Sequence, residues 1–371
     1  MPGAPAEPVD ADSQAPPSRG RRRRLLVGTG IGVGLLVALV VGAALVRVPY
    51  FLLAPGSVRP TERFISVEGA PSYPDGAGEI GYTTVSLRRA TALQALVGWL
   101  DPTVDVVEEQ AILGGQTQEE SREQNLRDMT DSKEVATAVA LEALGYDVTV
   151  TGTGAVVLEV RPDVPAATIL RAGDVITAVD GRGIQLADDL VAAVRERRPG
   201  DQLLLTVERA GIADPFLVTA DLVARPDDPD TAMLGVSTAT RDLEFVFPFE
   251  VTVDSGAVGG PSAGLAFALG IMDVLTPTSL TGGARVATTG TIDLDGNVGA
   301  VGGVPQKTVA VRRAGVDLFL VPSSEYDEAL RFAGDMRVEP VDTLDDALEV
   351  LSSLGGGASV LQARGTGPVT D

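Results

Sequence analysis

The sequence predicts an α+β protein of several domains that begins with a long apolar helix. Three observations indicate this. Residues 25–46 contain no charge and no proline. From residue 146 to about residue 223, short β-rich runs alternate with turn residues and short helical stretches. Beyond residue 240, strands alternate with longer helices, which is typical of a compact α/β or α+β unit. The 371 residues are enough for two or three domains with ordinary hydrophobic cores.

The apolar run at residues 25–46 is long enough to cross a bilayer as one helix. Five arginines, Arg19 and Arg21 to Arg24, precede it, and basic residues stay on the cytoplasmic side. We therefore expect a disordered cytoplasmic tail at residues 1–24, a single-pass transmembrane helix at residues 25–46, and extracytoplasmic domains after Val46, with the plasma membrane as the location. The alternative is a cleaved signal peptide, but the run is longer than the roughly 7–15 apolar residues usual for one.

The next segment, residues 47–145, is predicted to be a membrane-proximal α/β unit. Short β-rich runs lie between Glu62 and Leu87 and are separated by a turn-forming stretch. A helical stretch with the sequence ATALQALVGWL follows them. A second, polar helix is expected from about Gln118 to Leu144, where Gly145 is a suitable C-cap.

Composition removes several kinds of active site. The chain contains no histidine and no cysteine, so a Ser–His–Asp triad, a Cys–His dyad, a thiolate or imidazole metal site and a disulfide framework are excluded. Only two lysines occur, Lys133 and Lys307. Residues 47–371 carry 24 basic and 48 acidic residues, which argues against nucleic acid as a partner. We expect no metal and no cofactor.

Residues 146–225 are predicted to fold as a small domain of their own. Gly152, Thr153 and Gly154 precede an apolar strand that starts with Ala155 and Val156, and the phrase RPDVPAATILRAGDVITAVDGRGI follows. This stretch resembles a PDZ domain of the bacterial protease-associated type. The resemblance implies that a peptide adds to the exposed edge of a strand and that the glycine-loop amides bind its C-terminal carboxylate. The alternative is a small mixed sandwich without a ligand, in which Gly-Thr-Gly is only a turn.

A candidate nucleophile lies further along the chain. Gly260 to Gly264 satisfies G-x-S-x-G, the nucleophile elbow of α/β-hydrolases, but that fold needs a later histidine, which this chain lacks. Ser262 can still be a nucleophile if a lysine with a lowered pKa is its base. Lys307 is placed for this role because it begins a predicted helix, whose dipole favours the neutral amine. The alternative is a surface lysine at the start of a helix.

The sequence around both residues resembles a known family. VDSGAVGGPSAGLAFALGIMDVLT and VATTGTIDLDGNVGAVGGVPQKTVAVRRAGVDLFLVP closely resemble the proteolytic domain of the Lon-type serine peptidases. The resemblance implies a Ser–Lys dyad in which Ser262 is the nucleophile and Lys307 is the base. It also implies that Thr289 supports the lysine. Backbone amides around Gly260, Pro261 and Ser262 are then expected to form the oxyanion hole.

The resemblance also implies a domain arrangement. Residues 231–354 form the Lon-type proteolytic domain, residues 224–240 form a polar linker, and residues 355–371 form a disordered tail. No ATPase module is present in the sequence, so the resemblance is to the ATP-independent, membrane-anchored group that combines a PDZ domain with a Lon-type domain. In that arrangement the PDZ domain interrupts one discontinuous catalytic domain, whose first half is residues 60–145. Lys133 is expected to be solvated.

Together these observations predict a membrane-tethered, extracytoplasmic serine endopeptidase that hydrolyses peptide bonds without ATP. Its expected partners are protein or peptide substrates that are unfolded or membrane-associated, and the PDZ domain recruits them or gates the active site. The oligomeric state stays open, a homo-oligomer included. One alternative is a non-catalytic PDZ scaffold whose peptidase-like domain only binds peptides. Another is a signal-peptidase-like Ser–Lys enzyme that cleaves membrane-proximal sites.

Overall fold

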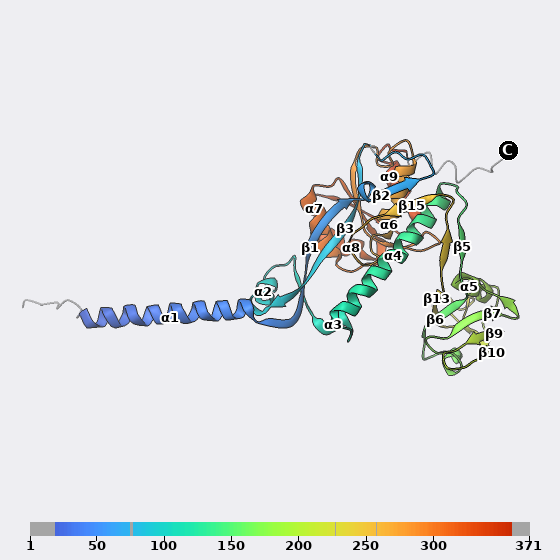
Figure 1. Ribbon diagram of the computed structural model, residues 1–371, viewed down its shortest axis with the longest axis horizontal. Coiled ribbons are helices and arrows are strands. Elements are labelled where there is room, and N and C mark those ends of the chain that lie inside the picture. The colour runs from blue at the N-terminus through green and yellow to red at the C-terminus, as the bar shows by residue number, and fades with distance from the viewer. Residues whose placement is uncertain (1–18, 75–76, 227, 257, 358–371) are drawn as a thin grey trace, which may run out of the picture.

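The computed structural model describes residues 19–74, 77–226, 228–256 and 258–357, and Figure 1 shows their arrangement. Its largest sheet contains β1 (Arg47–Pro60), β3 (Glu79–Thr91), β4 (Asp105–Glu108), β16 (Arg285–Thr288), β19 (Leu318–Pro322) and β20 (Arg337–Val341). The strands lie in the order β20-β19-β16-β3-β1-β4. β3 pairs antiparallel with β1 and parallel with β16. Strands from before residue 146 and from after residue 225 therefore share one sheet.

Both faces of this large sheet are buried, as the sequence of β19 illustrates. Successive side chains of a strand point to opposite faces. Leu318 and Leu320 pack into one hydrophobic core together with Phe267. Phe319 and Val321 pack into a second core on the other face. The unbroken apolar run of β19 is explained by this double burial.

Helices supply the two covering layers. On one face lie α4 (Gln118–Ala143), α6 (Gly264–Leu275) and α9 (Leu344–Ser352), and on the other lie α7 (Val304–Ala314) and α8 (Tyr326–Ala333). Every residue of α6 is buried, which its apolar composition allows on all sides of the helix. The expected polar helix from Gln118 is α4, and Thr117 and Glu120 form a capping box at its start.

A second, smaller sheet has a core of its own, which includes Ile176, Leu190 and Leu205. Its strands lie in the order β10-β9-β7-β6-β13, and β8 pairs with β7. The helix α5 (Ala187–Arg195) packs on this sheet. The strands of the sheet are β6 (Ala155–Val160), β7 (Val175–Val179), β8 (Arg182–Gly183), β9 (Gln202–Glu208), β10 (Phe216–Asp221) and β13 (Val236–Thr240).

The position of β13 differs from the sequence expectation. Residues 224–240 were expected to be a polar linker, and residue 231 was expected to open the proteolytic domain. Instead, Val236 to Thr240 form an edge strand of the smaller sheet, paired antiparallel with β6. The acidic and proline-rich stretch before residue 231 obscured a short run of residues that favour strands.

Two-stranded ribbons and short helices complete the described chain. β5 pairs with β14 and lies between the smaller sheet and the rest of the fold (Figure 1). The ribbon pairs are β5 (Thr149–Thr151) with β14 (Glu244–Val246), β2 (Ile65–Glu68) with β15 (Glu250–Val253), β11 (Val223–Ala224) with β12 (Ala232–Met233), and β17 (Thr291–Ile292) with β18 (Val298–Gly299). The remaining short helices are α2 (Ala92–Gly98) and α3 (Glu109–Leu113), with 3₁₀ turns at Glu62–Phe64, Pro165–Thr168 and Ser323–Glu325.

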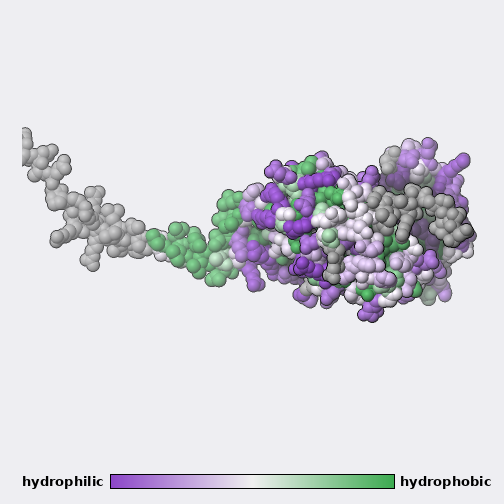
Figure 2. All heavy atoms as spheres, turned by 90° about the horizontal axis from the view of Figure 1, so that it is seen from above, coloured by the Kyte–Doolittle hydropathy of each residue, from purple (hydrophilic) through white to green (hydrophobic). Residues whose placement is uncertain are grey.

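The helix α1 (Arg19–Leu45) projects away from the other elements (Figure 1), and Figure 2 shows its described side chains as an apolar stretch. Within the described residues, no helix has the length and apolarity that crossing a membrane requires. The expected transmembrane helix includes residues 25–31, whose side chains lie outside the described part. Of the expected tails, residues 1–18 and 358–371 also lie outside it, and α1 already begins at Arg19.

Candidate functional site

Ser262 lies in a loop that is fixed to α4 immediately before α6 begins. The Gly260 N–H donates a hydrogen bond to the Asn125 carbonyl at 2.7 Å. The Ser132 hydroxyl donates to the Pro261 carbonyl at 3.1 Å. Gly259 passes so close to the helix that a Cβ there would lie 3.0 Å from the Asn125 Cβ. The loop therefore needs its glycines in order to pack against α4, and this packing presents Ser262 at the start of α6.

Lys307 lies in the first turn of α7 and is only 2 % exposed. Its Nζ donates to the Thr289 Oγ1 at 3.0 Å. The Thr289 hydroxyl in turn donates to the Ser262 carbonyl at 3.3 Å, and the Gly290 N–H donates to the same carbonyl at 3.1 Å. One buried hydroxyl thus joins the lysine amine to the backbone of the candidate nucleophile.

Burial sets the protonation of this lysine. Desolvation lowers the pKa of Lys307 from 10.5 to about 8, against the opposing effect of the Glu325 carboxylate. Both Glu325 carboxylate oxygens accept the Val301 N–H at 3.1 Å, which holds the carboxylate near the glycine-rich segment before α7. Burial raises the pKa of Glu325. A substantial fraction of Lys307 is therefore neutral near pH 8 and able to accept a proton.

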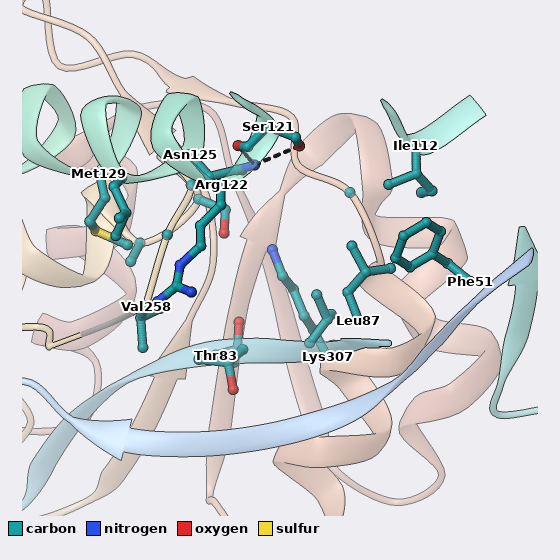
Figure 3. Close-up of a pocket in the computed structure, with 18 of the residues that line it drawn as sticks. Phe51, Thr83, Leu87, Ile112, Ser121, Arg122, Asn125, Met129, Val258 and Lys307 are labelled. Carbon is teal, nitrogen blue, oxygen red and sulfur yellow. Dashed lines mark hydrogen bonds between the residues drawn. The ribbon is translucent and has the colours of Figure 1, made fainter. Parts of the chain in front are cut away.

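Ser262 and Lys307 line the same cavity, which has a volume of about 790 Å³. Figure 3 shows the Lys307 side chain extending into this cavity, with α4 on the opposite side. Among the described residues, no hydrogen bond holds the Ser262 hydroxyl, and Lys307 is bonded to Thr289. The hydroxyl and the amine thus face one cavity without a direct bond, as is common for catalytic pairs before substrate binds.

The oxyanion donors differ from those expected. Gly260 was expected to contribute its amide, but that N–H is already bonded to Asn125, and Pro261 has no N–H. In the part of the chain that the structure describes, the N–H groups of Ser262 and Ala263 have no acceptor. Both precede the first residue of α6, where free amides and the helix dipole favour a negative charge. Gly260 instead bends the loop, with a φ of 92°.

The other candidate side chains have separate environments. Lys133 was expected to be solvated, but it is partly buried on α4, and burial lowers its pKa while Asp254 opposes this. Lys133 is not among the residues that line the cavity with Ser262. Across the described ranges, no group of three or more carboxylates lies close enough together to hold a metal ion.

The five residues expected to bind a peptide do not offer a free strand edge. Ala155 pairs with Ile176 of β7 on one side and with Thr240 of β13 on the other, and Val156 is paired on both sides as well. The loop amides are also occupied. Thr153 N–H donates to the Arg241 carbonyl at 2.8 Å, and Gly154 N–H donates to the Gln185 carbonyl at 3.0 Å. The residues Gly152, Thr153, Gly154, Ala155 and Val156 therefore present no free strand edge in this structure, and their expected role in peptide binding stays a prediction.

Among the described strands, β10 and β13 are the two edges of the smaller sheet, and β13 is the edge that lies beside α5. A cavity of about 420 Å³ lies between β13 and α5, with apolar lining from Leu190, Val191, Val194, Met233, Leu234 and Val236. Gly235 has a φ of 77°, and a Cβ there would lie 2.7 Å from the Val164 side chain, so this position requires glycine. We call this cavity the β13–α5 groove. The apolar–Gly–apolar run Met233 to Val236 was the signal that could have located it.

Comparison with known proteins finds two family matches, which lie on separate segments of the chain. Residues 142–218 match the PDZ domain family, and residues 242–353 match the Lon protease (S16) C-terminal proteolytic domain. The Lon protease of Campylobacter concisus is 36% identical over 179 residues, which cover 46% of this chain and 21% of that protein. The Lon protease of Koribacter versatilis is 38% identical over 108 residues, covering 27% of this chain and 13% of that protein.

Among solved structures, the PDZ domain of an SdrC-like protein from Listeria monocytogenes is 25% identical and has a TM-score of 0.21, with coverage of 23% of this chain and 87% of that one. The chain spans about a fifth or less of the length of the curated relatives named above. The expected combination of a PDZ domain with a Lon-type proteolytic domain, within a mixed α+β fold, is confirmed by the family matches.

Proposed function

We propose that this chain, which combines a PDZ domain with a Lon-type proteolytic domain, is a membrane-tethered serine endopeptidase that uses Ser262 and Lys307 without ATP. The observation that carries the proposal is the buried Lys307 amine, with a pKa lowered to about 8, in the same cavity as Ser262. A buried amine is costly for a fold, and titratable groups whose pKa is strongly shifted beside a cavity are frequent at functional sites.

The chemistry follows from the geometry. Neutral Lys307 accepts the hydroxyl proton of Ser262 as the oxygen attacks a peptide carbonyl carbon. The free N–H groups of Ser262 and Ala263 stabilise the tetrahedral oxyanion. As the C–N bond breaks, Lys307 returns the proton to the departing amine and leaves an acyl-serine. Water, deprotonated by Lys307, then attacks the ester, and the proton returns to Ser262 as the acid product leaves.

Thr289 positions this base. Its hydroxyl accepts a hydrogen bond from Lys307 and donates one to the Ser262 carbonyl, so it fixes the amine relative to the loop of residues 258–263, which we call the nucleophile loop. The bond also leaves the nitrogen lone pair of a neutral amine free to point elsewhere, because the amine is the donor. A modest side-chain rotation of Ser262 on substrate binding is the remaining step in our proposal.

The tether is supported by the sequence before β1 and by the described part of α1. The run from residue 25 to residue 46 is uncharged and follows five arginines. Leu35, Leu36 and Leu39 are 60% exposed or more on α1, so the described part of the chain does not cover them. Release of the full chain from bacterial membranes by alkaline carbonate would contradict the tether.

The catalytic proposal is tested with the full chain in detergent micelles and β-casein, a protein that needs no unfolding. We expect internal peptide bonds of β-casein to be cleaved, at a rate that added ATP and Mg²⁺ leave unchanged. The products are identified by mass spectrometry. If the full chain leaves β-casein intact, or if cleavage requires ATP, the proposed function is wrong and the non-catalytic scaffold is favoured.

We also propose that the smaller domain recruits peptide substrates through the β13–α5 groove. Its free strand edge can accept an extended peptide by main-chain hydrogen bonds, and its apolar lining can receive a side chain. We expect Val191→Glu, which adds a charge to the groove from an exposed position of α5, to weaken binding about tenfold. The probe is a pool of short fluorescein-labelled peptides with randomised C-terminal residues, followed by fluorescence anisotropy.

The matched control for this variant is Leu217→Glu. Leu217 is 64% exposed on β10, at the opposite end of the smaller sheet from β13. The Leu217→Glu variant adds the same charge to the same small domain, but outside the β13–α5 groove. Equal weakening by the two variants, or no weakening by Val191→Glu, would exclude the groove as the peptide site. An amidated pool shows whether the terminal carboxylate contributes.

A further inference from the structure

The cavity that contains Ser262 and Lys307 has two chemically different sides. One side is apolar and is built by Phe51 of β1, Leu87 of β3, and Ile112 and Leu113 of α3. Figure 3 shows Phe51, Leu87 and Ile112 gathered to one side of Lys307. The other side is built by α4 and the nucleophile loop.

Arg122 marks that second side. Figure 3 shows its side chain extending from α4 into the cavity, beside Val258 of the nucleophile loop and on the side of Lys307 away from Phe51. Within the described residues, no hydrogen bond or ion pair holds the Arg122 guanidinium. Arg127, one and a half turns along the same helix, is held by Gln124 at 3.0 Å and by Glu123 at 4.0 Å.

The charge of the cavity makes this arginine notable. The chain as a whole carries 51 acidic and 29 basic residues. The cavity is lined by Arg59, Arg122 and Lys307 but by a single acidic side chain among the described residues, Glu119. Glu119 lies three residues before Arg122, yet the two form no ion pair. A negatively charged group entering the cavity would therefore meet a guanidinium that keeps its donors available.

We propose that Arg122 is a specificity-determining residue that binds the carboxylate side chain of an Asp or Glu in the substrate, next to the bond that Ser262 attacks. The apolar side of the cavity receives an apolar residue on the other side of that bond. The proposal rests on the proposed peptidase function. A guanidinium can bind a carboxylate through two parallel hydrogen bonds, and the exposed Arg122 can be reached by a side chain of the substrate.

The test compares pairs of internally quenched peptides that differ only by Glu or Gln at one position near the cleaved bond, with every C-terminus amidated. The full chain in detergent micelles is used, and kcat/KM is measured for each pair. We expect about a tenfold preference for Glu at one position. Arg122→Gln should reduce that ratio to about one, and Arg122→Glu should favour a Lys-containing peptide at the same position.

Arg127→Gln is the matched control, because it removes an arginine from the same helix outside the cavity, and it should keep the preference for Glu. A wild type without any preference, or an Arg122→Gln variant that keeps it, would overturn the proposal. Cleavage of neither member of any pair would instead refute the peptidase function itself, so the two failures are distinguishable.

Discussion

Replacement of Ser262 by alanine is expected to lower kcat/KM for β-casein cleavage by a factor on the order of 10⁴ or more. The substitution removes the only oxygen that can form the acyl intermediate in the proposed mechanism. It should leave the fold intact, because the side chain is partly exposed and makes no hydrogen bond to any described residue. The measurement is the rate of appearance of internal casein peptides, with circular dichroism as the check on folding.

Ser353→Ala serves as the control for this variant. Ser353 is exposed at the end of α9, outside the cavity that contains Ser262. Its variant should cleave β-casein at the wild-type rate. If Ser262→Ala retains cleavage comparable with Ser353→Ala, then either the activity is a contaminant or another residue is the nucleophile, and our assignment fails.

Replacement of Lys307 by methionine is expected to lower kcat/KM by about 10³-fold, because the general base is lost while the cavity keeps its shape. Lys307→Arg should be equally inactive, since a guanidinium does not lose its proton in this range and cannot act as base. Lys133→Met is the control, because Lys133 is the other lysine of the chain and does not line the cavity.

The substitution Lys307→Met should also make the folded protein more stable. Because burial lowers the pKa of Lys307 from 10.5 to about 8, the protonated amine destabilises the folded chain at neutral pH. We therefore expect Lys307→Met to raise the free energy of unfolding at pH 7 by about 1–3 kcal/mol. Between pH 8 and 10.5 the unfolded chain binds more protons than the folded chain, so wild-type stability should rise with pH across this window. Denaturant unfolding at pH 8 and at pH 10.5 measures the difference in the free energy of unfolding between Lys307→Met and wild type, which should be smaller at pH 10.5.

If neutral Lys307 is the base, as we propose, its pKa sets the pH dependence of the rate. kcat/KM should rise with pH and level off above about pH 8, the pKa of the buried amine. Glu325→Gln should move the midpoint to lower pH, because the carboxylate stabilises the charged amine, while the Gln oxygen can still accept the Val301 N–H. A midpoint that Glu325→Gln leaves in place would show that Lys307 does not control the profile.

Lys307 can be recognised as a candidate base from the amino-acid sequence because the chain offers few alternatives, whereas Ser262 and Thr289 are indicated by the motifs that resemble the Lon-type peptidases. With no histidine, no cysteine and two lysines, a serine nucleophile has few bases to use. The motifs around Ser262 and Lys307 then indicate a known dyad. The structure adds the distance from Lys307 to Thr289 and the burial that lowers the amine pKa, neither of which a local motif contains.

The role of Gly260 and the peptide site could not be predicted, for a shared reason. Whether an amide is free depends on what packs against it, and the partner of the Gly260 N–H is Asn125 on α4, far away in the sequence. Whether a strand edge is free depends on strand order, and β13 fills the edge of β6 from beyond β10. Local patterns predict strands and turns well, but they do not say which edges remain open.

The bounds of single helices and strands could be predicted more closely from the sequence. The helix expected from about Gln118 to Leu144 is observed as α4, which ends at Ala143. Its ends could be predicted because capping residues before its start and a glycine after its end are visible in the sequence. The apolar strands and α6 were likewise recognisable from composition. What local patterns did not define was the order of strands in the large sheet, which joins β3 to β16 across the whole smaller domain.

That junction has a consequence for synthesis. Tyr82 of β3 pairs with Thr288 of β16, so the ribosome must make the smaller domain before the central pair of strands can form. Contacts between such distant segments form late, because closing a long loop costs entropy. A nascent chain therefore holds α4 and β3 long before it holds Ser262 or Lys307. Each chain therefore acquires the cavity that contains Ser262 and Lys307 only after residue 307 has been made, so the proposed activity would have to wait until the smaller domain has been synthesised.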